Sequence, residues 1–157
     1  AAIATKSDLI LRDRDVLAGI KEHSPVLCKI TITTASDELS RRVEPGVCPS
    51  SARFEAIRAL SKAGIFTGIL LMPVLPFLED SEENVLAIVR KAHEAGARFI
   101  YAAFGMTLRE NQRIWYYDRL RGIGGHMGAG MNVEARGPGS FGKFSARNAK
   151  NTGSCMI

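Results

Sequence analysis

Lys6 and a pair of threonines are the side chains in this sequence that most directly suggest ligand binding. Lys6 follows a short apolar run, and a lysine ammonium at the end of a strand can pair with a carboxylate in a half-buried pocket. Thr31 and Thr33 alternate with isoleucines, so their hydroxyls are predicted on one face of an extended strand. The plainer alternatives are a solvent-exposed lysine and threonines that serve only as good strand formers.

Two further polar residues lie beside these positions. Ser7 is next to the lysine and is predicted either to line the same pocket or to be the N-cap of the following helix. Glu44 precedes a proline in a loop on the carboxyl side of the threonine strand, which is the side on which barrel active sites are built. Glu44 can alternatively form a local surface ion pair with Arg41 or Arg42.

The cysteines and histidines do not form a metal motif. Cys28, Cys48 and Cys155 are an odd set with wide spacing, which argues against a disulfide framework and a compact metal knuckle and predicts reduced thiols. The histidines lack a second ligand at metal-binding spacing, so we expect non-catalytic roles for all three: His23, His93 and His126.

The elements that position these residues alternate between β-branched apolar runs and helical patterns, which is typical of βα units around a parallel sheet. Strands are predicted over residues 1–5, 26–34, 65–75 and 97–104. Helical segments are predicted over residues 8–22, 36–42, 49–63, 80–95 and 107–120. Four such units are too few for a closed eight-unit barrel of roughly 250 residues, but they can form half of one. Because the first strand begins at once, we expect a further segment before Ala1.

Composition bounds the class of protein. The chain has 157 residues, of which 46% are hydrophobic and 24% charged, as in one globular core. The net charge of +5 is weak support for a nucleic-acid partner. Residues 69–78 form the longest apolar run, too short for a membrane span and interrupted by prolines. Residues 1–5 lack the basic flank and apolar run of a secretion signal, so a cytoplasmic protein is expected. We expect residues 1–120 to form the domain and the glycine-rich residues 121–157 to be a disordered or non-homologous tail.

Five short segments, read in order, resemble the radical S-adenosylmethionine (SAM) proteins related to spore photoproduct lyase and DNA repair photolyases. They are residues 4–13 (ATKSDLILRD), 30–33 (ITIT), 42–46 (RVEPG), 71–76 (LMPVLP) and 104–109 (FGMTLR). The resemblance covers about residues 3–120 and ends there. It implies an α/β fold, the C-terminal half of a (β/α)6 partial TIM-barrel-like domain, with about four parallel strands and flanking helices.

The resemblance also implies a cofactor pocket. Lys6 matches the family lysine that pairs with the SAM carboxylate, and Thr31 and Thr33 match positions near its ribose or methionine part. Met72 and Pro73 match a position that lines the adenine, although methionine is also a common core residue. The pocket set implied by the resemblance is Lys6, Ser7, Thr31, Thr33, Glu44, Met72 and Pro73.

The family holds a [4Fe-4S] cluster through a CxxxCxxC loop after its first strand, and no cysteine here has that spacing. Intact relatives reductively cleave SAM to a 5′-deoxyadenosyl radical, in some cases for DNA-lesion repair as lyases. We therefore expect a fragment that is inactive by itself, because four-iron clusters need grouped thiolates. We also expect a homo-oligomer that covers the open barrel face. The alternative is a non-catalytic nucleic-acid-binding or structural protein built on a half-barrel.

Overall fold

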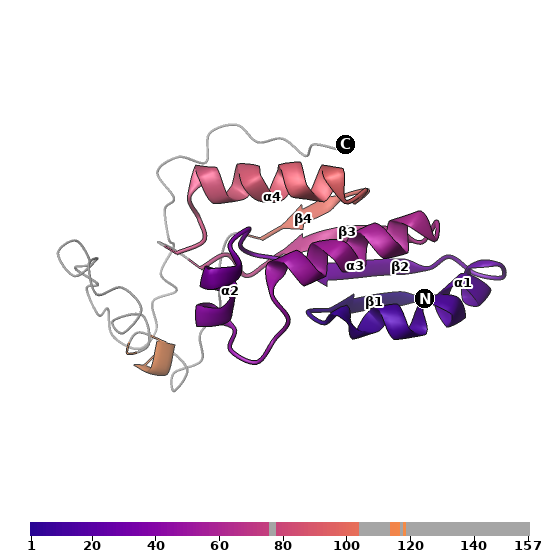
Figure 1. The fold of residues 1–157 in the computed structure, drawn as a ribbon, viewed down its shortest axis with the longest axis horizontal. Coiled ribbons are helices and arrows are strands. Elements are labelled where there is room, and N and C mark those ends of the chain that lie inside the picture. The colour runs from indigo at the N-terminus through magenta and orange to yellow at the C-terminus, as the bar shows by residue number, and fades with distance from the viewer. Residues whose placement is uncertain (76–77, 104–113, 117, 119–157) are drawn as a thin grey trace, which may run out of the picture. The chain divides into compact units, whose positions relative to one another are not determined.

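The computed structural model describes residues 1–75, 78–103, 114–116 and 118 and shows an α/β fold with one four-stranded parallel sheet (Figure 1). The strands are β1 (Ala2–Thr5), β2 (Leu27–Thr31), β3 (Phe66–Leu71) and β4 (Ile100–Ala102), paired in that order. The helices are η1 (Asp8–Asp13, a 3₁₀ helix), α1 (Arg14–Lys21), α2 (Asp37–Val43), α3 (Ser50–Lys62) and α4 (Glu82–Glu94). The predicted alternation of strands and helices is therefore confirmed.

Local signals explain where these helices begin and end. Ser36 and Ser81 are the N-caps of α2 and α4, and their hydroxyls accept hydrogen bonds from the amides of Leu39 and Asn84. Gly64 and Gly96 follow α3 and α4 with φ angles of 72° and 80°, a left-handed conformation that favours glycine at the end of a helix. The two helices thus return the chain to the sheet where the sequence predicts.

The strands are shorter than their apolar runs. The run over residues 26–34 forms a strand only from Leu27 to Thr31, and the run over residues 65–75 only from Phe66 to Leu71. Val26 and Ile65 precede the two strands, and residues 32–34 and 72–75 continue beyond their carboxyl ends. There the side chains of Asn84 and Glu79 bond the backbone of Thr33 and Leu75. β4 spans three residues where eight were predicted, although backbone hydrogen bonds to β3 extend from Arg98 to Ala103; residue 104 lies outside the described residues.

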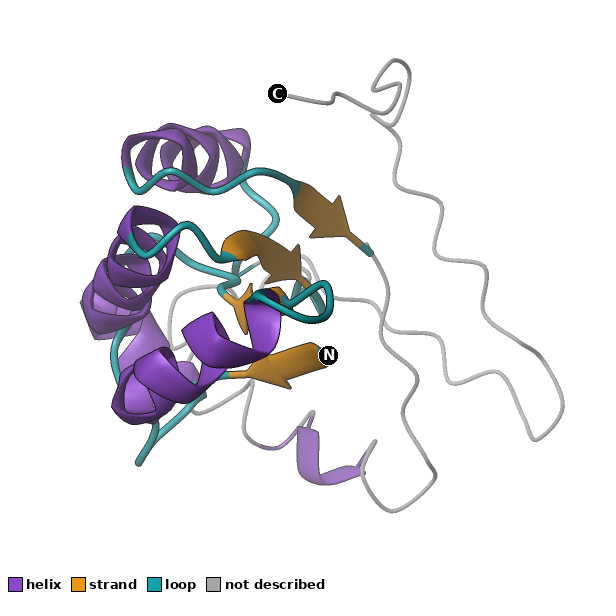
Figure 2. Ribbon diagram, turned by 90° about the vertical axis from the view of Figure 1, so that its right-hand side faces the viewer, coloured by secondary structure: helices purple, strands orange, loops and turns teal. Residues whose placement is uncertain are grey.

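The hydrophobic core lies between the sheet and the helices, which cover the same side of the strands (Figure 2). Ile30 and Ile69 are paired neighbours on β2 and β3 and are both fully buried. Helix α3 buries Ile57 and Leu60, and α4 buries Ile88. One apolar layer therefore holds both helices against the sheet.

The opposite face of the sheet carries exposed apolar side chains. Phe66 and Tyr101 are 53% and 59% exposed. The Phe99 ring stacks on that of Phe66, with centroids 5.7 Å apart, and lies over Gly68, where a Cβ atom would be 2.4 Å from it. Gly68 is thus the residue that lets the aromatic ring approach β3.

The chain divides into two compact units, with the boundary between Met106 and Thr107. The sheet and its helices belong to the first unit. In the second unit, residues 114–116 and 118 are helical, within the range predicted as helix 107–120. The expected boundary at residue 120 and the expected tail lie outside the described residues. In the described part of the chain, no helix is both long and apolar enough to cross a membrane.

Candidate functional site at the carboxyl edge of the sheet

Three charged side chains from separate elements meet at the carboxyl ends of β1 and β2. Lys6 follows β1, Glu44 follows α2, and Arg53 lies in the first turn of α3. The Glu44 carboxylate accepts a hydrogen bond from the Lys6 ammonium through Oε1 and from Nη2 of Arg53 through Oε2 at 2.6 Å. We call Lys6, Glu44 and Arg53 the Lys–Glu–Arg triad. The Lys6 side chain is 41% exposed, that of Glu44 17% and that of Arg53 1%, so the lysine is the most exposed member of the triad.

Arg53 ties the triad to the backbone. Its Nη1 donates to the carbonyl of Thr31 at 3.0 Å, and its Nε donates to the carbonyl of Cys48 at 2.9 Å. The Cys48 thiol in turn donates to the carbonyl of Lys6 at 3.1 Å. The loop between α2 and α3 is thereby fixed to the last residue of β2 and to the residue after β1.

The electrostatics of the triad favour a charged Glu44. Burial alone raises the pKa of this carboxyl, but the hydrogen bonds and positive charges of Lys6 and Arg53 outweigh burial and hold the pKa below its ordinary value of 4.5. Glu44 is therefore a carboxylate across the neutral range. Its two oxygens are directed to different cations, which is the geometry that fixes a carboxylate in one orientation.

A second polar network lies beside the triad, around Glu79 and Asn84. The Thr33 hydroxyl donates to Oε1 of Glu79 at 2.7 Å, and the amide of Leu75 donates to Oε2 at 3.1 Å. The Asn84 side-chain amide donates to the carbonyls of Thr33 at 2.9 Å and Glu79 at 2.7 Å. These bonds join the chain after β2 to the loop after β3 and to the start of α4.

Glu79 is 1% exposed and has no cation within ion-pair distance among the described residues. Burial raises its pKa above the ordinary value, and the nearby Glu44 charge adds to that effect. The hydrogen bonds from Thr33 and Leu75 and the charge of Lys6 lower the pKa but do not compensate. Glu79 therefore loses its proton at a higher pH than an ordinary glutamate.

The structure brings some predicted site residues together and gives others a local role. Lys6 and Glu44 are in contact, and the Glu44 carboxylate pairs with Lys6 and Arg53. Of the two local arginines proposed as alternative partners, Arg41 pairs with Asp37 at 3.9 Å between Nη2 and Oδ2. The Ser7 hydroxyl accepts from the Leu9 amide at 3.1 Å and is the N-cap of η1, as one of its two predicted roles required.

The two predicted threonines occupy different environments. Thr31 is 7% exposed and ends β2, where its carbonyl accepts from Arg53. Thr33 is 5% exposed and lies beyond the strand, so its hydroxyl bonds Glu79 instead of standing beside that of Thr31 on a continuous strand. Met72 and Pro73 follow β3 at the same edge, half-buried and exposed respectively.

Sequence reasoning missed Arg53, Glu79 and Asn84. A signal for Arg53 is present, since it occupies the same helical stripe as Ile57 and Leu60 at i, i+4 and i+7. An arginine on a buried stripe requires partners for its charge. Glu79 and Asn84 carry no comparable pattern, because their partners lie about 50 residues earlier in the chain.

The described residues contain no group of three or more cysteine, histidine or acidic side chains that could hold a metal ion. Cys28 is buried in β2, and burial raises the pKa of its thiol. Cys48 lies in the loop before α3. His23 and His93 are exposed, while Cys155 and His126 lie outside the described residues.

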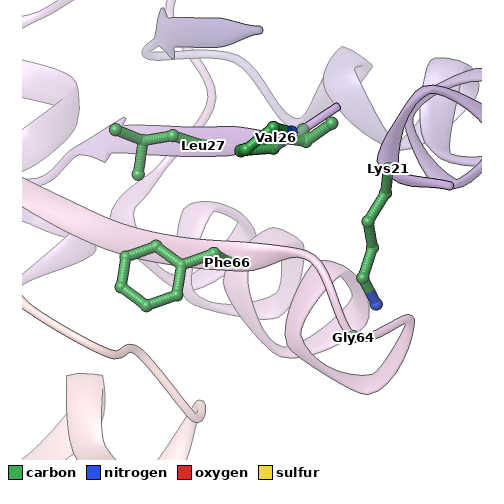
Figure 3. A pocket seen from close by; sticks show the side chains of 6 residues that line it. Lys21, Val26, Leu27, Gly64 and Phe66 are labelled. Carbon is green, nitrogen blue, oxygen red and sulfur yellow. The ribbon is translucent and has the colours of Figure 1, made fainter. Parts of the chain in front are cut away.

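An apolar hollow of about 350 Å³ lies at the opposite, amino end of the strands (Figure 3). Its lining includes Val26, Leu27 and Phe66, with Lys21 at one side. Because parallel α/β sheets bind ligands at the carboxyl ends of their strands, the Lys–Glu–Arg triad is the better candidate site.

The chain is similar to parts of longer proteins. An uncharacterized protein of Mycobacterium tuberculosis is 33% identical over 115 residues, which are 73% of this chain and 34% of that protein. An uncharacterized protein of Methanocaldococcus jannaschii is 33% identical over 81 residues, 52% of this chain and 30% of that protein. A third, from Acidianus two-tailed virus, is 28% identical over 111 residues, 69% of this chain and 35% of that protein.

This chain therefore spans about a third of the length of the relatives it matches. No protein-family model and no solved structure matches it.

Proposed function

We propose that this chain is part of a radical SAM enzyme related to spore photoproduct lyase, and that the Lys–Glu–Arg triad lies in its SAM pocket. In this proposal the parallel sheet is half of a (β/α)6 barrel, and Lys6 binds the SAM carboxylate. The observation that carries the proposal is a lysine, its side chain 41% exposed, whose ammonium Glu44 holds at the carboxyl edge of a parallel sheet, where α/β folds bind ligands.

The fit to SAM rests on unused donors. A lysine ammonium has three N–H donors, and Glu44 accepts from the ammonium through one carboxylate oxygen. The ammonium can therefore donate to a ligand carboxylate while it stays bonded to Glu44. Thr31, Thr33, Met72 and Pro73 follow from the resemblance as the walls of the same pocket. SAM, when bound and reduced by a cluster, supplies the hydrogen-abstracting radical, and the protein binds and orients it.

The described cysteines do not fit a [4Fe-4S] cluster. Cys28 is buried in β2 and Cys48 lies in a loop, whereas such a cluster needs grouped thiolates. We derive no step of the reaction from these residues. We propose that the cluster ligands belong to a part of a longer protein that this chain does not contain, in line with the greater length of its relatives. A DNA substrate rests on the resemblance and on the net charge of +5.

Calorimetric titration of the whole chain with SAM tests the proposal. We expect binding that Lys6→Ala weakens by roughly ten- to a hundredfold, since a hydrogen bond to a charged group contributes about 1.5–3 kcal/mol. An analogue of SAM without its carboxylate should bind the wild type and the variant equally. Lys62→Ala, at the exposed end of α3, is the matched control.

Absence of SAM binding by the wild type contradicts the proposed pocket. Equal loss of affinity for SAM and for the analogue contradicts the assignment of Lys6 to the carboxylate.

A further inference from the structure

Arg53 is the largest fully buried side chain among the described residues. A guanidinium is always charged. Removing it from water is costly unless its N–H groups find hydrogen-bond acceptors and its charge is paired. Here Nε, Nη1 and Nη2 each donate to a different acceptor, namely Cys48, Thr31 and Glu44. Stability of the core alone does not require this arrangement, because well-packed apolar residues in place of a whole buried ion pair are often equally stable.

We infer that Arg53 is a positioning residue that, through Glu44, holds the Lys6 ammonium ready for an anionic ligand group. Arg53 cannot touch the ligand itself, since it is 1% exposed. The identity of the ligand rests on the function proposed above, whereas the positioning of Lys6 by Arg53 is a property of the chain alone.

The physical basis is the flexibility of lysine. A lysine side chain is among those that lose the most rotamer entropy when they are ordered. Glu44 restricts Lys6 before a ligand arrives, but an isolated exposed ion pair contributes little and is mobile. Arg53 changes this, because it fixes the second oxygen of Glu44 and the loop carbonyl of Cys48 at the same time.

Arg53→Lys separates charge from geometry. Lysine keeps the positive charge, but its single ammonium cannot reproduce the planar fork that donates to three separate acceptors. Arg58→Lys is the matched control, since Arg58 lies five residues further along the same helix and its side chain is 36% exposed. Circular dichroism checks that both variants keep the fold.

The first readout is the ammonium signal of Lys6 in a lysine-selective ¹H–¹⁵N spectrum, assigned by its absence from Lys6→Ala. An ammonium held by a fixed carboxylate exchanges with water more slowly than a free one. We expect this signal in the wild type and in Arg58→Lys, and its loss in Arg53→Lys. The second readout is SAM affinity. It should fall by about tenfold in Arg53→Lys, because SAM binding must then also order the Lys6 side chain.

An unchanged Lys6 signal in folded Arg53→Lys overturns the inference, and so does a lost signal with unchanged affinity. If Arg53→Lys does not fold, Glu44→Gln tests the link through Glu44, because it keeps Arg53 but replaces one acceptor oxygen and the charge of the carboxylate with a neutral amide; a persisting Lys6 signal in that variant overturns the inference. If the wild type does not bind SAM, the proposed function fails, yet the signals of Lys6 still decide whether Arg53 positions it.

Discussion

Asn84 joins three segments at the carboxyl edge of the sheet, and its removal should destabilise the fold more than its exposure suggests. Its amide nitrogen donates to the carbonyls of Thr33 and Glu79. Its carbonyl oxygen accepts from the backbone amide of Ala35 at 2.9 Å and from the Thr34 hydroxyl at 3.2 Å. Asn84→Ala deletes all four bonds and leaves four polar groups without their partner.

The magnitude follows from those four bonds. A typical intramolecular hydrogen bond contributes about 1 kcal/mol net, and a buried group left without a partner costs more. Asn84 is half-buried, so water can replace some of its contacts. We therefore expect Asn84→Ala to lower the free energy of unfolding by about 2–3 kcal/mol, and the Tm by on the order of 10–20 °C for a unit of this size.

Urea unfolding of the full chain, followed by circular dichroism, measures this loss. Arg90→Ala is the control, because Arg90 is exposed on the same helix and should change stability by no more than about 0.5 kcal/mol. Asn84→Asp should destabilise at least as much as Asn84→Ala, since it places a carboxylate oxygen against the carbonyls of Thr33 and Glu79, to which the amide now donates. An Asn84→Ala variant as stable as Arg90→Ala would show that the network does not hold these segments together.

The remaining predictions concern pH, packing and assembly. Because the pKa of Glu79 is raised, its ionisation destabilises the fold, so wild-type stability should fall as pH rises from 4.5 through the raised value. Glu79→Gln should remove that fall in urea unfolding over a pH series, and parallel wild-type and variant curves would contradict it. Gly68→Ala should cost about 1–3 kcal/mol through overlap with the Phe99 ring. Gly19→Ala, whose added Cβ meets nothing within 4 Å, should be neutral or stabilising in the same assay. We expect the chain to self-associate through its exposed sheet face and Phe66→Lys to weaken that association in sedimentation velocity; a monomeric wild type at micromolar concentration would refute this.

The order and type of the elements could be predicted from local sequence. β-branched runs, serine N-caps such as Ser36 and glycines such as Gly64 act over a few residues, so the four strands and the helices between them follow from their own sequences. The strand ends were less predictable. The apolar runs of β2 and β3 continue past Thr31 and Leu71, and only pairing with neighbouring strands decides where a ladder stops.

Two of the three triad residues could be predicted as well. Lys6 and Glu44 were candidates because each follows a strand or helix on the side where α/β folds bind ligands. Their direct contact across 38 residues was not visible in the sequence, and neither was the buried Arg53 that fixes it.

What the sequence alone determined is therefore the alternation of strands and helices and the residue types available at one edge of the sheet. Tertiary structure decided which of those residues meet. Parallel strands bring residues 6, 31 and 33 to one edge, and the loops then bring Glu44 and Glu79 to them from distant positions. Hydrogen bonds and ion pairs between such segments depend on distances of about 3 Å, which only the assembled sheet and its helices set.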